Sequence, residues 1–380
     1  MPIIKPMQKI LCFILFITVP IAAFAQARLS GPAAEYPFWF VFEEGKKAFH
    51  DENYGKALEL FEEARAGRRT RFSRLEASFI SLLSIGEVRR IGDSLDFIEK
   101  YIEERNQSDA DAALAELVHR VGRDALKNSA KTALEFFGKL KEYPEVEYWI
   151  GEIYRLEGEF PIAISQYQKA LNDNAEPKAP AWRINVLYKI AEVSRDMQNY
   201  TKMESTLNEI LKNDKFWNES GNFIRNAMTK TLSNDGINNF LVMYRNKNSM
   251  TEQAHRMLGE FCYKSGRYML AENHLSFAVL EQNTVLIEEA KRKRFDYAFS
   301  TLDDLIHEIN RRPDLKKYMI DVEYYRTLYY LSTALYAQRK TAAAKEIWTF
   351  IAGHNEAGEW SRRSQNQLVK PFVEKTVKMP

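Results

Sequence analysis

A repeated helical unit with small residues at fixed positions is the feature that most restricts how this chain can fold. From residue 37 to about residue 370, apolar residues recur every three or four positions, as in amphipathic helices, and no stretch alternates like a strand. A glycine is followed nine residues later by an aromatic residue, then by alanine, a large apolar residue and a second alanine. Copies of this unit begin at Gly45, Gly151 and Gly259. The sequence therefore predicts an all-α chain built from helix pairs.

The spacing of the unit has a physical explanation. Glycine and alanine are expected where the two antiparallel helices of a pair cross, because only a small side chain fits between closely packed backbones. The large residues fill the space between successive pairs. Gly158 and Gly266, which follow the first helix of two copies, permit the left-handed backbone that commonly ends a helix.

These residues resemble the tetratricopeptide motif, whose period is about 34 residues. The three good copies lie about three periods apart, so weaker units are expected between them. The weaker predicted units are residues 73–104, about 109–140, 184–211 and 222–246, followed by an off-register helical segment at 284–312 and a late unit from Tyr329 through Ala344 to Trp348. A polar helix at 359–370, stopped by Pro371, is the expected end cap. The resemblance implies a right-handed superhelical solenoid of about nine antiparallel helix pairs with a C-terminal capping helix.

The N-terminus has the three parts of a secretory signal. Lys5 and Lys9 precede an apolar run at residues 10–24, and Ala23-Phe24-Ala25 supplies a cleavage site. An uncleaved membrane anchor is the alternative, but the run is shorter than the about 20 residues of a membrane-spanning helix, and Pro20 interrupts it. We therefore expect a periplasmic protein. The expected division is a signal peptide at 1–25, a linker at 26–36, the tetratricopeptide-like domain at 37–370 and a tail at 371–380.

Charge and cysteine content limit the possible partners. Removal of the signal takes away Lys5 and Lys9, so the formal charge falls from +2 to zero. Nucleic-acid binding needs a basic surplus, so no nucleic-acid partner is expected. The basic run at 291–294 follows two glutamates and is interpreted as a solvated helix face rather than a lipid or nucleic-acid patch. Cys262, the single cysteine left, is expected to be buried rather than reactive.

No motif for catalysis or cofactor binding is present. The phosphate-binding and dinucleotide-binding glycine patterns and the serine elbow are absent. The histidines show no metal-binding spacing, and there is no cysteine cluster, so neither a metal nor a cofactor is expected. We expect a protein that is not an enzyme. A carboxylate pair assembled across a groove stays open, because such a pair leaves no motif in the sequence.

The resemblance also implies that the exposed sides of the first helices line a concave groove. Tyrosine and arginine are favoured at binding hot spots, so these positions are candidate partner contacts. Ion pairing within the groove is an equally good interpretation of the glutamate and arginine residues. The candidate groove residues are Tyr148, Glu152 and Arg155 in one unit, Tyr188, Glu192 and Arg195 in the next, and Arg256, Glu260 and Tyr263 in the unit of Gly259.

The leading hypothesis is a protein–protein interaction scaffold of the periplasm. It binds a partner peptide or helix in the groove, needs no cofactor, and serves cell-envelope assembly. The alternative is a glycan- or peptidoglycan-binding helical-repeat module of the envelope, which would present aromatic side chains from the pairs Tyr324-Tyr325 and Tyr329-Tyr330.

Overall fold

The described part of the chain is helical. The computed structural model describes residues 37–84, 138–171, 180–214, 217–218, 221–241, 243, 250–293 and 297–374. Over these residues the chain forms helices and no strand, which confirms the all-α prediction. The predicted signal peptide (1–25) and linker (26–36), and most of the predicted units at 73–104 and 109–140, lie outside the described residues.

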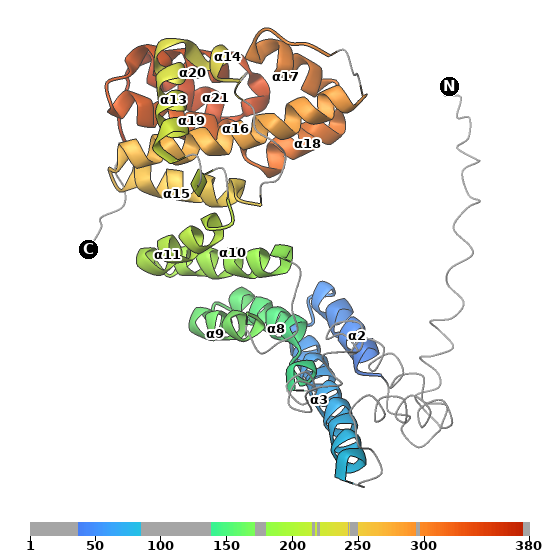
Figure 1. Ribbon diagram of the computed structural model, residues 1–380. Coiled ribbons are helices and arrows are strands. Elements are labelled where there is room, and N and C mark those ends of the chain that lie inside the picture. Colours follow the sequence, from blue (N-terminus) through green and yellow to red (C-terminus); the bar gives the residue numbers. More distant parts are fainter. Residues whose placement is uncertain are drawn as a thin grey trace, which may run out of the picture. The chain divides into compact units, whose positions relative to one another are not determined.

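The chain divides into two compact units, Met1–Ile153 and Tyr154–Pro380, and each is described by itself. In the first unit α2 (Phe38–His50) packs along α3 (Tyr54–Ser84), and both are labelled in Figure 1. Helix α3 runs without a break past residue 73, where the sequence predicted the start of a new helix pair. Helix α8 (Pro144–Leu156) begins in this unit and ends in the second.

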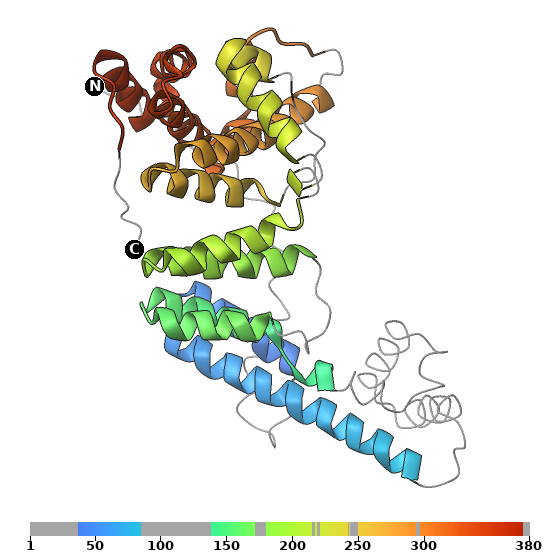
Figure 2. The same ribbon diagram turned by 60° about the vertical axis from the view of Figure 1, so that its left-hand side comes forward.

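Adjacent antiparallel helix pairs also make up much of the second unit. Helix α10 packs on α11, α15 on α16 and α19 on α20, and Figure 2 shows α10 and α11 side by side. The helices of this unit are α9 (Phe160–Ala170), α10 (Pro180–Asp196), α11 (Tyr200–Leu211), α13 (Gly221–Asn234), α14 (Gly236–Leu241), α15 (Glu252–Lys264), α16 (Tyr268–Lys293), α17 (Leu302–Asn310), α18 (Pro313–Asp321), α19 (Tyr324–Ala337), α20 (Thr341–Gly353), the short 3-10 helix η2 (Asn355–Ala357) and α21 (Glu359–Val369).

The small residues lie where the helices cross, as predicted. A Cβ atom on Gly45 would lie 2.7 Å from the Phe61 ring, and one on Gly259 would lie 2.5 Å from Cγ of Leu275. Real side chains do not approach so closely, so the helices of each pair meet through the glycine backbone. The alanines of the second helices, twelve residues after each glycine, are fully buried at Ala57, Ala163 and Ala271.

The same turn follows the first helix of five pairs. One residue adopts a left-handed φ, at Glu52 (58°), Gly158 (81°), Gln198 (58°), Gly266 (85°) and Arg339 (66°). The amide of the next residue then donates to the carbonyl five positions back, at 2.8–3.0 Å in all five turns. This pattern satisfies carbonyl groups at the helix end. Only the two glycines could be recognised from the sequence, since the other turns use residues with no preference for this conformation.

The central core of the second unit lies around α16, α19 and α20. Trp348, Tyr324 and Tyr329 are fully buried there. Helix α16 continues to Lys293, so the predicted off-register segment at 284–312 comprises the end of this helix and the separate helix α17. Pro313 begins α18, where its missing N–H costs no hydrogen bond. Helix α21 packs on α20 and confirms the predicted last helix.

Gly259→Ala tests the close crossing. The added methyl group must displace Leu275, so the free energy of unfolding should fall by about 1–3 kcal/mol, as for other overpacked cores. Gly353→Ala is the matched control, because Gly353 is in the same unit and a Cβ atom added there would have nothing within 4 Å. Urea unfolding followed by circular dichroism measures both variants. Equal stability of the two would contradict the crossing geometry.

Gln198→Gly tests the left-handed turn. An L-residue in this conformation is strained by roughly 1–2 kcal/mol, whereas glycine is not. We expect the variant to be more stable by roughly 0.5–1 kcal/mol after the loss of chain entropy on folding. Lys212→Gly, at a helix end with φ of −59°, should instead lose stability. A change of the same sign in both variants, measured by urea unfolding, would argue against a strained turn at Gln198.

Candidate functional site

Two of the three candidate residues of α10, Tyr188 and Glu192, contact the next helix pair. The Tyr188 hydroxyl donates to the Met250 carbonyl oxygen at 2.7 Å and accepts from the Ala254 amide at 3.1 Å. Burial raises the pKa of Tyr188. Glu192 accepts from the Gln253 side chain at 3.1 Å. The expectation that Tyr188 is exposed is wrong, because the start of α15 covers it. Arg195 is exposed and contacts Asp196 at 3.1 Å.

The candidate residues of α15 are held by α19 and by the C-terminal segment. Arg256 forms ion pairs with Glu252, at 3.4 Å, and with Glu323. Glu260 is buried and accepts from Arg326 at 2.7 Å. Tyr263 is fully buried, and its hydroxyl accepts from the Glu374 amide at 2.8 Å, so its predicted exposure is also wrong. Ion pairing inside the protein, the second of the two interpretations, accounts for Arg256 and Glu260.

The candidate residues of α8 have mixed exposure. Tyr148 is half-buried, and its ring meets the Trp149 ring edge to face, with centroids 5.8 Å apart. Glu152 is buried and Arg155 is half-buried. Tyr148 is therefore the one candidate groove tyrosine on these helices that keeps a substantial exposed area.

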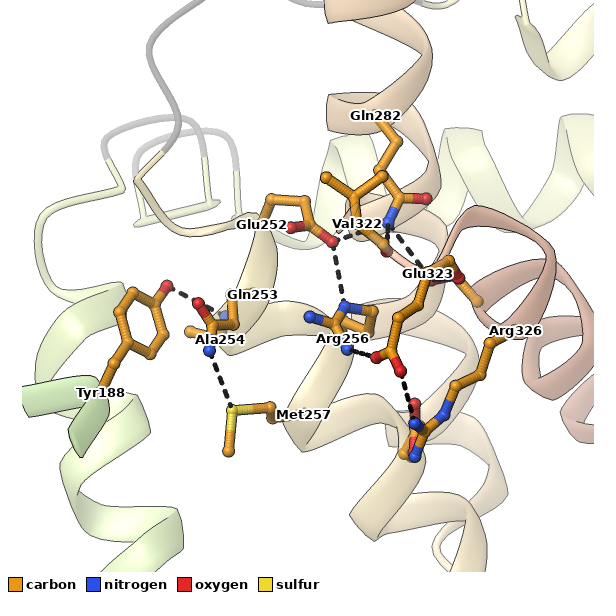
Figure 3. A network of polar contacts seen from close by, with 12 residues as sticks. Tyr188, Glu252, Gln253, Ala254, Arg256, Met257, Gln282, Val322, Glu323 and Arg326 are labelled. Atoms are coloured by element: carbon orange, nitrogen blue, oxygen red, sulfur yellow. Dashed lines mark hydrogen bonds and ion pairs between the residues drawn. The ribbon is translucent and has the colours of Figure 1, made fainter. Parts of the chain in front are cut away.

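The sequence did not single out Glu323 and Arg326, yet they complete the polar network between α15 and α19 (Figure 3). Arg326 donates to Glu323 at 2.7 Å as well as to Glu260. At the other end of the network, Gln282 joins Glu252, at 2.7 Å, to the Val322 carbonyl, at 2.9 Å. The only sequence signal for the pair is their spacing of three residues in the chain, which is too common to identify a site.

A pocket of about 190 Å³ opens beside this network. Its lining comes from the end of α17, from α18 and α19, and from η2 and α21. Apolar atoms of Met319, Tyr325 and Trp360 contribute to the lining, and Ile320 exposes 69% of its surface at the edge. Lys316, Glu323, Arg326 and Glu356 add charges of both signs. Sites for small molecules usually measure about 300–1,000 Å³, so this pocket suits a single side chain better than a cofactor.

The aromatic pairs proposed for glycan binding are not available on the surface. Tyr324 and Tyr329 are fully buried, and Tyr325 and Tyr330 expose only 8% and 4%. The sequence interpretation left one tyrosine of each pair exposed, whereas α16, α20 and α21 cover this helix on several sides.

The predictions for the basic run and the cysteine can be compared with the structure. Arg292 is exposed and pairs with Glu289 at 3.2 Å, as expected for a solvated helix face. Cys262 is buried, which confirms that prediction, and burial raises the pKa of its thiol to about 11.

None of the helices in the described ranges combines the length and the apolar character that crossing a membrane requires.

Comparisons with known proteins give one relative and no family. No protein-family model matches the chain. The chain is similar to an uncharacterized protein of Treponema pallidum (strain Nichols), with 23% identity over 336 residues that cover 87% of this chain and 89% of that protein. This similarity extends over most of both proteins but carries no information about activity.

The rate at which Cys262 is alkylated tests whether its side chain is buried on α15. Thiol alkylation requires the thiolate, and a pKa of about 11 leaves little of it at pH 8. We expect iodoacetamide to modify the native chain at least about a hundredfold more slowly than the chain unfolded in urea, given that both the pKa and the burial oppose the reaction. Mass spectrometry at timed intervals measures both rates. Comparable rates would place Cys262 at an accessible position.

Proposed function

We propose that the chain is an exported interaction scaffold, a tetratricopeptide-like protein that binds a segment of another protein in the periplasm. The proposal rests first on the repeated unit: small residues at the helix crossings and the same left-handed turn after the first helix of five pairs. Short helix pairs cannot bury their apolar faces alone, and stacking of about nine of them as a right-handed solenoid would do so. The polar helix α21 then acts as the end cap that such an array needs.

Export is the second part of the proposal. A basic start, a short apolar run and an Ala-Phe-Ala cleavage site are the features of a cleavable signal. A chain processed there begins at Gln26 and is delivered to the periplasm, where a role in assembly of the cell envelope is the leading hypothesis.

The single observation that carries the binding proposal is the pocket beside the α15–α19 network. Interfaces between proteins typically place an apolar centre inside a polar rim, with aromatic residues and arginine favoured. Met319, Tyr325 and Trp360 supply the apolar part, and Ile320 projects beside it. Arg326 and Glu323, which expose 30% and 37% of their side chains, supply a rim already ordered by ion pairs.

The chemistry of the partner follows from this pocket. It should be a peptide or helix with one apolar side chain, sized for the pocket, flanked by charged or hydrogen-bonding groups. Because Arg256 and Glu260 are committed to α19, they act as a support that holds Glu323 and Arg326 in place. The groove candidates Tyr188 and Tyr263 are not part of this surface, since both are buried. The glycan alternative loses its aromatic platform for the same reason.

Ile320→Asp should lower the affinity for the partner by at least about tenfold, equivalent to about 1.4 kcal/mol, because a charge replaces the apolar side chain at the pocket edge. Met269→Asp is the matched control, since Met269 is 67% exposed on a different helix of the same unit. A photo-reactive residue at position 320, with position 269 as reference, identifies the partner in intact cells. Titration of the purified partner against both variants then gives the affinities.

Two results would contradict the proposal. One is a partner adduct equally abundant at positions 320 and 269, and the other is an Ile320→Asp affinity equal to that of the Met269→Asp control. The intact mass of the protein from the periplasmic fraction tests export separately, because a chain cleaved at the predicted site begins at Gln26.

A further inference from the structure

A buried group of ionisable side chains lies away from the pocket, where the helix pairs α10–α11 and α15–α16 meet. It contains Asp214, just after α11, His255 on α15 and Glu281 on α16. Their exposed fractions are 3%, 0% and 3%. One ligand atom from each of these residues lies within 4.8 Å of the others. Two carboxylates so close in the interior are costly unless positive charge accompanies them.

The distance between His255 and Asp214 is that expected between two ligands of one metal ion. The Nε2 atom of His255 lies 3.4 Å from Oδ2 of Asp214. An N–H···O hydrogen bond is usually about 2.7–3.2 Å long, so this contact is longer than a good hydrogen bond. Atoms bound to one zinc ion at about 2.0–2.2 Å in a tetrahedron lie about 3.3–3.6 Å apart. The observed separation falls within that range.

We propose that Asp214, His255 and Glu281 form a structural binding site for one divalent cation, with zinc as the preferred ion. One imidazole nitrogen and two carboxylate oxygens supply three ligands, and the two negative charges balance the ion. The imidazole favours zinc over magnesium or calcium, which prefer oxygen ligands alone. The site does not depend on the proposed function of the pocket.

The surroundings orient each ligand. The Trp217 amide donates to Oδ1 of Asp214 at 2.9 Å, which turns Oδ2 toward His255. The Thr251 hydroxyl lies 3.0 Å from that Oδ2 and 3.3 Å from Oε1 of Glu281, between the two carboxylates. Its single hydrogen can be donated to only one of the two carboxylates at a time.

The His255 ring is fixed on both sides. Its Nδ1 atom lies 3.0 Å from Nδ1 of His274, so Nε2 is the atom that faces the carboxylates. The ring stacks on Phe277 at 5.1 Å between centroids and meets Trp217 at 4.8 Å. Metal-binding histidines typically donate their second ring N–H to an acceptor, which sets the ring orientation. The Nδ1 atom of His274 can be that acceptor.

The alternative is a chain of hydrogen bonds with no metal, running from His274 through His255 to Asp214. It uses the same residues but requires the 3.4 Å contact to be a hydrogen bond. The two arrangements differ in one measurable property, the bound cation. A site with ligands from three segments would also join the two helix pairs, so binding of the cation would be coupled to folding.

The experiment measures metal content in the full chain. The chain is unfolded with a chelator, refolded, and dialysed against equal concentrations of zinc, manganese, iron(II) and magnesium ions. We expect one equivalent of zinc per chain by mass spectrometry of the metals. Cobalt(II) in place of zinc should show the visible absorption bands of a tetrahedral site. No retained cation, or retention of magnesium instead of zinc, would overturn the proposal.

Two variants make the assignment specific. Glu281→Gln should weaken zinc binding by at least about tenfold. Loss of a group that only supports a ligand already weakens metal binding by about that much. Glu272→Gln is the matched control, because Glu272 is a buried glutamate on the same helix that pairs instead with Lys340 at 2.6 Å. Equal zinc binding by the two variants would overturn the site. If Glu281→Gln does not fold, the cobalt spectrum of Asp214→Asn is compared with that of the wild-type chain instead. Identical tetrahedral bands in the two would overturn the site.

Discussion

The close crossing of two helices at a small residue is the constraint on which the described structure depends. At Gly45 and Gly259 the partner helix lies where a Cβ atom would otherwise be. This contact sets how near the helices of a pair approach, and the left-handed turn after the first helix sets where the second begins. Since crossing and turn are seven residues apart in the chain, one short stretch of sequence determines the geometry of a whole pair.

This geometry also determines which surfaces of the helices remain free. A helix pair has several faces, and in the second unit the following pair covers more of the first helix than the repeat pattern indicated. Tyr188 is closed off by the start of α15, and Tyr263 by the C-terminal segment. Each buried tyrosine satisfies its hydroxyl group with a backbone partner, as burial of a polar group requires. These tyrosines thus connect neighbouring elements.

Polar side chains also link helices that the apolar core alone would leave free to slide. Arg256 and Arg326 join α15 to α19 through Glu323 and Glu260. Ion pairs that are partly buried, such as these, add little net stability, but removing one partner leaves the other charge uncompensated, which favours a single arrangement. The group around His255 has the same connecting position between two other pairs. The surface pocket and the buried cation site both arise where such connections meet the packed helices.

The sequence by itself determined the helical class, the positions of the close crossings, the two glycine turns, the burial of Cys262 and the final helix. Each follows from local spacing, because residues three to four apart share a helix face and glycine alone adopts the left-handed backbone without strain. Only the tertiary structure decided the turns at Gln198 and Arg339, the burial of Tyr188 and Tyr263, the pocket beside Ile320 and the meeting of Asp214, His255 and Glu281. The two turns are local, but Gln and Arg have no preference for a left-handed backbone that would reveal them. The other features join residues far apart in the chain, and their neighbours are set by how pairs stack, which no local pattern encodes.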